Sequence, residues 1–268
     1  MSKVLASFSG VSVSFREGRQ QTFALRDLDL DIRAGEKLAI IGESGSGKST
    51  LARALAGLLP EEALLEGHIA WPGFGHAPLG GRDLGFVFQD PGASLNPVLT
   101  IGEQVAEGAR RHLGLSWADA AARALGLLQR VKIPQPERIL TAFPHQMSGG
   151  QRQRVAIAAA IAAEPKMLIA DEITSALDMV VQAEIVLLLQ QLVRDEGMTL
   201  LFVTHDIALA SQLADRIVVL KDGLLVEAGP TGPLLANPAS AYTKMLIDSH
   251  LDFDSEVLVS PLVDGAGK

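Results

Sequence analysis

The stretch Gly42 to Ser49, GESGSGKS, has the residue types and spacing of a phosphate-binding loop. It fits the pattern G-x-x-x-x-G-K-[ST] and lies between an apolar run, KLAII, and a helix-forming run, TLARALAGL. Glycines let the backbone come close to a phosphate, so that several N–H groups can point at it. The alternative, a glycine-rich turn with an incidental lysine, is disfavoured by the strand and helix on either side. The residues predicted to bind a nucleotide here are Gly42, Ser44, Gly45, Gly47, Lys48, Ser49 and Thr50.

Charged and hydroxyl groups give this loop its predicted chemistry. We expect Lys48 to reach the β- and γ-phosphate oxygens and the Ser49 hydroxyl to bind Mg²⁺. The later run MLIADE puts Asp171 and Glu172 at the end of an apolar strand. There Asp171 would hold Mg²⁺ through water, and Glu172 would polarise an attacking water. An ordinary pair of strand-end carboxylates is the alternative interpretation.

Two further polar residues, Gln89 and His205, also end apolar strands. The Gln89 amide could contact Mg²⁺ or the attacking water, and the His205 imidazole could touch the γ-phosphate. Taken singly, each is more often a solvated or hydrogen-bonded structural residue. Because α/β sheets collect ligands at the carboxyl ends of their strands, we expect both residues to converge with the carboxylates on one site.

A second glycine-containing stretch, MSGGQRQR, begins at Met147 and precedes the apolar run VAIAAAIAA. Small residues at a helix start leave backbone N–H groups pointing outward, and the helix dipole favours negative charge there. The four residues that form this second anion-binding candidate are Ser148, Gly149, Gly150 and Gln151. By itself the stretch is better explained as a helix N-cap followed by flexible glycines.

These candidate residues need a sheet and helices to position them, and the sequence predicts an α/β fold. Short apolar runs without polar alternation indicate strands that are covered on both faces of a parallel sheet. Such runs occur at 37–41, 84–88, 167–170, 200–203 and 216–220, and helical patterns occur at 49–58, 151–163 and 180–196. The alternation of the two favours right-handed crossover connections.

The region from Pro91 to His145 has a different pattern, with helical stretches at 101–113 and 117–131, several prolines and no convincing strand. We interpret it as a helical insertion into the sheet domain. The predicted organisation is therefore a P-loop ATPase core at 1–90 and 146–246, a helical subdomain at 91–145 and a tail at 247–268. The last residues, 252–268, have the composition of a frayed end.

Composition limits the function classes. The chain has 268 residues, no cysteine and a formal net charge of −8, so disulfides are excluded and a nucleic-acid partner is not expected. No apolar run approaches the roughly 18 residues that span a bilayer, and no secretory signal is recognisable at the N-terminus. We therefore expect a soluble chain whose membrane role, if any, comes through a partner.

Taken together and in order, GESGSGKS, Gln89, MSGGQ, MLIADE, SALD and His205 resemble the ATP-binding subunits of ABC transporters. The resemblance implies a P-loop core with a mostly parallel sheet, an N-terminal antiparallel β region and a helical insertion. It also implies that two subunits dimerise head to tail, so that Ser148 to Gln151 cap ATP held by the other subunit. By the same resemblance Glu172 is the general base and His205 the switch histidine, while Asp178 meets the partner across the interface. Phe15, with Phe23 in reserve, is the candidate for stacking on adenine.

Two shorter stretches, FQDPGASLNP and NPASAYTKMLI, are similar to the ATPase subunits of dipeptide, oligopeptide and nickel importers. This narrower resemblance implies a peripheral location at the cytoplasmic face of the bacterial inner membrane. The implied partners are two transmembrane permease subunits, a second ATP-binding subunit that is identical or homologous and, indirectly, an extracytoplasmic solute-binding protein. The segment after Gln89 would contact the permeases. Such proteins usually have proline where this chain has Ile173, so the position of Glu172 is expected to be less rigid.

Two other functions are open at this stage. A soluble ABC-type ATPase acting outside transport would usually carry two nucleotide modules or a long coiled-coil insertion, whereas this chain has one module. A P-loop kinase would need an acceptor site, which the sequence does not reveal.

Overall fold

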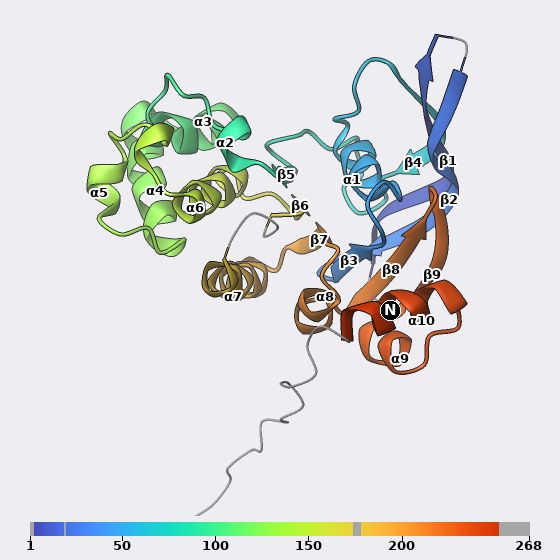
Figure 1. Ribbon diagram of the computed structural model, residues 1–268. Coiled ribbons are helices and arrows are strands. Elements are labelled where there is room, and N and C mark those ends of the chain that lie inside the picture. Colours follow the sequence, from blue (N-terminus) through green and yellow to red (C-terminus); the bar gives the residue numbers. More distant parts are fainter. Residues whose placement is uncertain (1–2, 19, 174–177, 252–268) are drawn as a thin grey trace, which may run out of the picture.

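The computed structural model describes residues 3–18, 20–173 and 178–251, which fold around two sheets (Figure 1). The strands are β1 (Val4–Glu17), β2 (Gln20–Arg33), β3 (Lys37–Ile41), β4 (Ala63–Ala70), β5 (Leu84–Val87), β6 (Met167–Asp171), β7 (Thr199–Val203), β8 (Arg216–Lys221) and β9 (Leu224–Pro230). The helices are α1 (Lys48–Ala56), α2 (Pro91–Ser94), α3 (Ile101–Leu113), α4 (Trp117–Arg130), α5 (Pro136–Ile139), the 3₁₀ turn η1 (Pro144–Gln146), α6 (Gly149–Ala160), α7 (Met179–Glu196), α8 (Ile207–Leu213), α9 (Thr231–Ala236) and α10 (Ala241–Leu251).

The larger sheet has six strands in the order β5-β6-β7-β3-β8-β9. Its neighbours pair in parallel, except that β9 runs antiparallel to β8 at one edge. Alternate residues of β3 enter two different apolar cores: Ala39 and Ile41 face one, and Leu38 and Ile40 face the other. Burial on both faces explains why these strands are continuously apolar.

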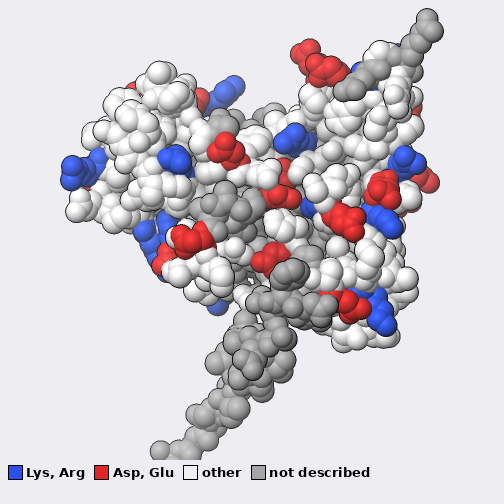
Figure 2. All heavy atoms as spheres, in the orientation of Figure 1, with Lys and Arg blue, Asp and Glu red and all other residues white. Residues whose placement is uncertain are grey.

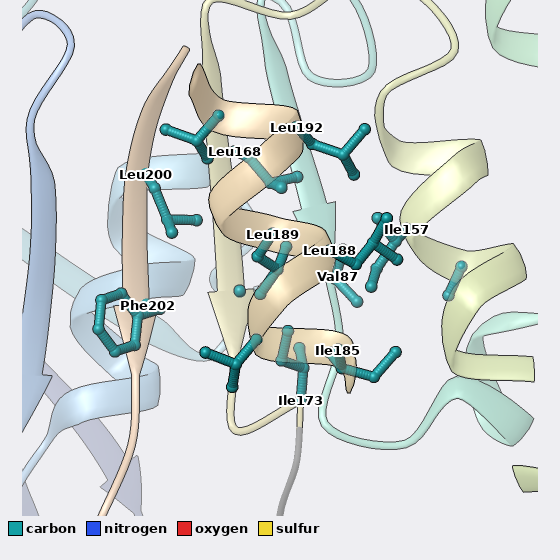
Figure 3. Packing of buried hydrophobic residues seen from close by; sticks show 14 of the residues in the cluster. Val87, Ile157, Leu168, Ile173, Ile185, Leu188, Leu189, Leu192, Leu200 and Phe202 are labelled. Carbon is teal, nitrogen blue, oxygen red and sulfur yellow. The ribbon is translucent and has the colours of Figure 1, made fainter. Parts of the chain in front are cut away.

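The two cores lie on opposite faces of the six-stranded sheet. One core fills the space between this sheet, helix α1 and the antiparallel sheet β2-β1-β4. The other core is covered by α6, α7 and α8, and Figure 3 shows Leu188, Leu189 and Leu192 of α7 among buried side chains that include Leu168 and Phe202 of the sheet and Ile157 of α6. Both faces of the sheet are therefore buried, and the loops at the strand ends carry the polar residues.

The α/β fold class predicted from the sequence is confirmed. Each predicted strand is present within a residue or two, and the region 91–145 forms α2 to α5, which lie with α6 to one side of the sheet in Figure 1. The antiparallel edge strand β9 was not predicted. The domain boundaries themselves stay a prediction, and the tail at 252–268 lies outside the described residues.

The surface carries charges of both signs. On the face seen in Figure 2, lysine and arginine are interspersed with aspartate and glutamate rather than gathered in one patch. Among the described helices, none combines the length and the hydropathy that crossing a bilayer requires.

Candidate phosphate-binding site

The loop between β3 and α1 leaves no room for side chains at two of its glycines. A Cβ on Gly42 would lie 2.2 Å from the Leu220 carbonyl oxygen, and one on Gly47 would lie 2.3 Å from the Ala24 carbonyl oxygen. Both glycines also have positive φ angles, of 149° and 101°. The glycines of GESGSGKS are therefore needed to seat the loop against β8 and β2.

Lys48, the first residue of α1, is held by the loop that precedes it. Its Nζ donates hydrogen bonds to the carbonyl oxygens of Gly42 and Glu43, both at 2.9 Å. The side chain is only 5% exposed, and burial lowers the pKa of its ammonium group, although the carboxylates of Glu172 and Asp171 oppose this shift. A buried cation at the start of a helix is well placed to attract phosphate oxygens.

Ser49 and Asp171 form the predicted magnesium pair. The Ser49 hydroxyl donates to Asp171 Oδ1 at 2.7 Å, joining the start of α1 to the end of β6. Burial raises the pKa of the Asp171 carboxyl, and the hydrogen bond from Ser49 works against this. The hydroxyl and carboxylate oxygens are hard ligands of the kind Mg²⁺ prefers. Within the described residues no group of three or more His, Asp or Glu is placed to hold a metal ion.

Glu172 is the point on which the remaining polar residues converge. Gln89 Nε2 donates to Glu172 Oε2 at 2.9 Å, while Lys48 Nζ and His205 Nδ1 each lie 4.0 Å from Glu172 Oε1. The four side chains come from the ends of β5, β6 and β7 and from α1. The structure thus brings Gln89 and His205 together with Glu172 at the carboxyl edge of the sheet, as the sequence predicts.

The backbone of Glu172 adopts a left-handed conformation with a φ of 47°. For a residue other than glycine this costs about 1–3 kcal/mol and requires support from its surroundings. Its N–H donates to the Val203 carbonyl oxygen at 3.1 Å, and the next residue, Ile173, is buried in the core beneath α7 (Figure 3). Burial of Ile173 gives the residue next to Glu172 an anchor in the core. That Glu172 is less rigid here than with proline stays a prediction.

A polar pocket of about 310 Å³ opens beside these groups. It is lined by Ala24, Ser44, Gly45, Gly47, Lys48, Ser49, Thr50, Gln89 and Glu172. Both candidates for stacking on adenine lie near Ala24, which lines the pocket. Phe23 precedes Ala24 in the sequence, and Phe15 on β1 pairs with Thr22 on β2. Phe23 is 37% exposed, whereas Phe15 is partly buried against the core. Which of them stacks on a base stays a prediction.

The stretch Ser148 to Gln151 lies at the start of α6 and does not line this pocket. The Ser148 hydroxyl accepts a hydrogen bond from the Gln151 N–H at 3.3 Å, and the Gln151 side chain accepts one from the Ser148 N–H at 2.9 Å. A Cβ on Gly150 would lie 2.8 Å from Val181 of α7, whose N–H donates to Asp178 Oδ1. Gly150 thus lets the starts of α6 and α7 meet, which places Asp178 beside the stretch.

Known proteins resemble this chain in both sequence and fold. A protein-family model described as ABC transporter matches residues 25–175. A candidate peptide import ATP-binding protein of Brucella abortus is 41% identical over 98% of this chain and 82% of its own length. The chain belongs to the ABC transporter family. Its ATP-binding cassette is 41% identical to glutathione import ATP-binding protein GsiA of Salmonella typhimurium, over 92% of this chain and 42% of that longer protein.

A solved ABC cassette has the same architecture. The dimeric post-hydrolysis structure of the cassette MJ0796, bound to ADP and Pi, superposes with a TM-score of 0.73 at 32% identity, covering 85% of this chain and 99% of that one. The sequence-based assignment to the ABC-type ATPases, with ATP as the ligand, is confirmed. The names of the relatives agree with the narrower resemblance to peptide importers.

One feature of this ABC cassette lies beyond the residues predicted to bind nucleotide. An apolar groove of about 340 Å³ runs from the edge strand β5 to α6, with Phe88, Leu95 and Ala160 among its lining residues. The Phe88 ring is 39% exposed and rests against Phe86 with their centroids 4.5 Å apart. The unbroken apolar run LGFVF that ends beside Gln89 is the sequence signal that could have indicated it.

Proposed function

We propose that this chain is the ATP-hydrolysing subunit of a bacterial importer for peptides or for nickel and other metal complexes. The observation that carries the proposal is the convergence of Lys48, Gln89 and His205 on Glu172 beside one polar pocket. The names of the relatives support peptide import in particular. In this proposal ATP hydrolysis by the chain drives import of the substrate through separate permease subunits.

The pocket residues divide the chemistry between them. Lys48 would neutralise charge on the β- and γ-phosphates, and backbone N–H groups of the loop would hold their oxygens. Glu172 would accept a proton from the attacking water, which Gln89 would help to orient through the bond that joins the two side chains. Mg²⁺ bound at Ser49, Asp171 and Gln89 would withdraw charge from the phosphates. His205 would contact the γ-phosphate.

Two copies, or this chain and a homologous one, would complete each site. Ser148 to Gln151 and Asp178 would face nucleotide held by the other subunit, because in their own chain they lie outside the pocket. ATP then acts as a cross-link, and hydrolysis removes a contact that holds the dimer closed.

The permease subunits would dock in the apolar groove beside β5. An exposed aromatic in a groove is suited to receive a short apolar segment of a partner. Because Phe88 lies next to Gln89, docking in the groove would affect the position of Gln89 in the catalytic pocket. This arrangement would place the chain peripherally at the cytoplasmic face of the inner membrane. A solute-binding protein would take part only through the permeases.

The decisive experiment isolates the chain from membranes of a cell that expresses it with its neighbouring genes. We expect transmembrane proteins to co-purify in detergent and Phe88→Asp to abolish this while ATP binding remains. The matched control is Leu64→Asp, which changes an apolar residue that is 53% exposed on β4, away from the groove. Recovery of the chain without any membrane protein would favour a soluble ATPase, and phosphate transfer to an acceptor without free phosphate release would favour a kinase.

A further inference from the structure

Helix α10 reaches the phosphate-binding loop through a single side chain. The Tyr242 hydroxyl oxygen accepts a hydrogen bond from the backbone N–H of Glu43 at 3.2 Å, across 199 positions of sequence. The ring is 8% exposed and belongs to the same core as Leu246 and Ile247, and the Lys221 ammonium lies 4.6 Å from its centre. The phenol is therefore held in place by its neighbours.

The peptide unit between Gly42 and Glu43 links this hydroxyl to Lys48. Its N–H donates to Tyr242, and its carbonyl oxygen, that of Gly42, accepts from Lys48 Nζ at 2.9 Å. Because a peptide unit is planar, fixing the direction of its N–H also fixes the direction of its C=O. Tyr242 thus restrains an oxygen that positions the lysine ammonium group.

The start of α10 is itself anchored to the six-stranded sheet. Glu227 of β9 accepts hydrogen bonds from the N–H groups of Ala239 at 2.9 Å and Ser240 at 3.1 Å. The Ser240 hydroxyl then accepts one from the Tyr242 N–H at 3.2 Å. Tyr242 is consequently placed relative to the same sheet that carries the catalytic residues, which gives its hydroxyl a fixed location.

We propose that Tyr242 is a positioning residue for Lys48: its hydroxyl orients the Gly42–Glu43 peptide and thereby tightens the binding of ATP. This inference rests on the proposed ATPase function. Burial raises the pKa of the phenol, so the hydroxyl stays neutral at physiological pH. The stretch NPASAYTKMLI, which looked like a family marker in the sequence, then contains a residue that supports the nucleotide site.

The test is Tyr242→Phe in the full chain, because phenylalanine keeps the buried ring and removes only the hydroxyl. We expect the Kd for MgATP, measured by calorimetric titration, to rise roughly three- to tenfold, the effect of one hydrogen bond. The KM of ATP hydrolysis should rise by the same factor. The midpoint of thermal unfolding of the nucleotide-free protein should stay within about 2 °C of wild type.

Leu246→Ala is the matched control, since it removes a buried side chain of the same helix without touching the hydroxyl. It should lower the unfolding midpoint more than Tyr242→Phe and weaken ATP binding less. Binding by Tyr242→Phe within about twofold of wild type, or an equal loss in both variants, would overturn the positioning role. A wild-type chain that binds no MgATP would instead overturn the proposed function.

Discussion

The two glycine-containing stretches that could bind phosphate are built in opposite ways. In the loop at 42–49, the Lys48 ammonium bonds to carbonyl oxygens of the same loop, whereas the Ser49 hydroxyl bonds to Asp171 at the end of β6. At the start of α6, the two hydrogen bonds between Ser148 and Gln151 stay within one helix turn. The first stretch is thus part of a pocket wall, whereas the second caps its own helix and lies against α7 through Gly150.

This difference is what we would expect if one domain carries two phosphate-binding patterns because each site is shared between two subunits. A stretch that caps its own helix and lines no pocket with the catalytic residues would complete a site only when another subunit presents nucleotide to it. The following predictions test whether the loop at 42–49 does its chemistry alone and whether the start of α6 works on a partner.

The largest effect is expected at Glu172. Glu172→Gln keeps the shape of the side chain but removes the base, so ATP hydrolysis should fall about 10²- to 10⁴-fold. ATP binding should persist, because Lys48 and the loop are unchanged, and the ATP-bound dimer should accumulate. Phosphate release, ATP titration and size-exclusion chromatography with ATP would measure these quantities. The control, Glu62→Gln, changes an exposed glutamate in the turn after α1 and should leave hydrolysis, ATP binding and dimer formation unchanged. Full turnover by Glu172→Gln would show that Glu172 is not the base.

A mixing experiment tests the shared site directly. Lys48→Ala should lose nucleotide binding, and Ser148→Arg should block the face offered to a partner, so each variant alone should be inactive. If sites are shared in a symmetric dimer, an equal mixture pairs at random and about a quarter of all sites are intact. Phosphate release by the mixture, set against each variant alone, measures this recovery. Activity that never exceeds the sum of the separate variants would contradict a composite site.

Sequence reasoning could find the catalytic residues because their signals are local. GESGSGKS is contiguous, Asp171 is the last residue of β6, and Gln89 and His205 each come shortly after an apolar strand whose end is fixed by the parallel sheet. The left-handed backbone of Glu172 could not be found in this way, because its contacts, with the Val203 carbonyl of β7 and through the buried Ile173, form only in the folded chain. The bond between Tyr242 and Glu43 joins residues 199 positions apart. The choice between Phe15 and Phe23 depends on how strands β1 and β2 pair and twist, which neither residue type reveals.

A moderate effect is expected where the core supports Glu172. Ile173→Ala should leave a cavity that costs about 2–4 kcal/mol of the free energy of unfolding. It should also lower kcat more than it raises KM, because the loss of support displaces Glu172 but not Lys48. Denaturant unfolding and steady-state hydrolysis would measure the two effects. The control, Ile185→Ala, removes the same kind of side chain from the same core, on α7. It should cost similar stability and keep kcat. An equal fall in kcat for Ile173→Ala and Ile185→Ala would show that Glu172 needs no local anchor.

The smallest effect compares two capping boxes, at the starts of α6 and α3. Ser148 with Gln151 and Thr100 with Glu103 make the same reciprocal bonds. Loss of such a cap costs about 1 kcal/mol of stability, so Ser148→Ala and Thr100→Ala should unfold at similarly lowered temperatures. Only Ser148→Ala should also slow ATP hydrolysis, because only that cap would face a partner's nucleotide.

The same pair of variants should differ in its dependence on pH. Hydrogen bonds from the Thr100 side chain and N–H lower the pKa of Glu103. A carboxyl whose pKa falls on folding stabilises the folded state above its ordinary pKa, and this contribution is lost as pH falls through the lowered value. The cost of Thr100→Ala should therefore shrink below about pH 4, near the ordinary pKa of glutamate, while the cost of Ser148→Ala should stay constant because Gln151 does not titrate. Thermal unfolding at a series of pH values would measure both costs, and a parallel fall for the two variants would mean that the caps are not held by the bonds assigned to them.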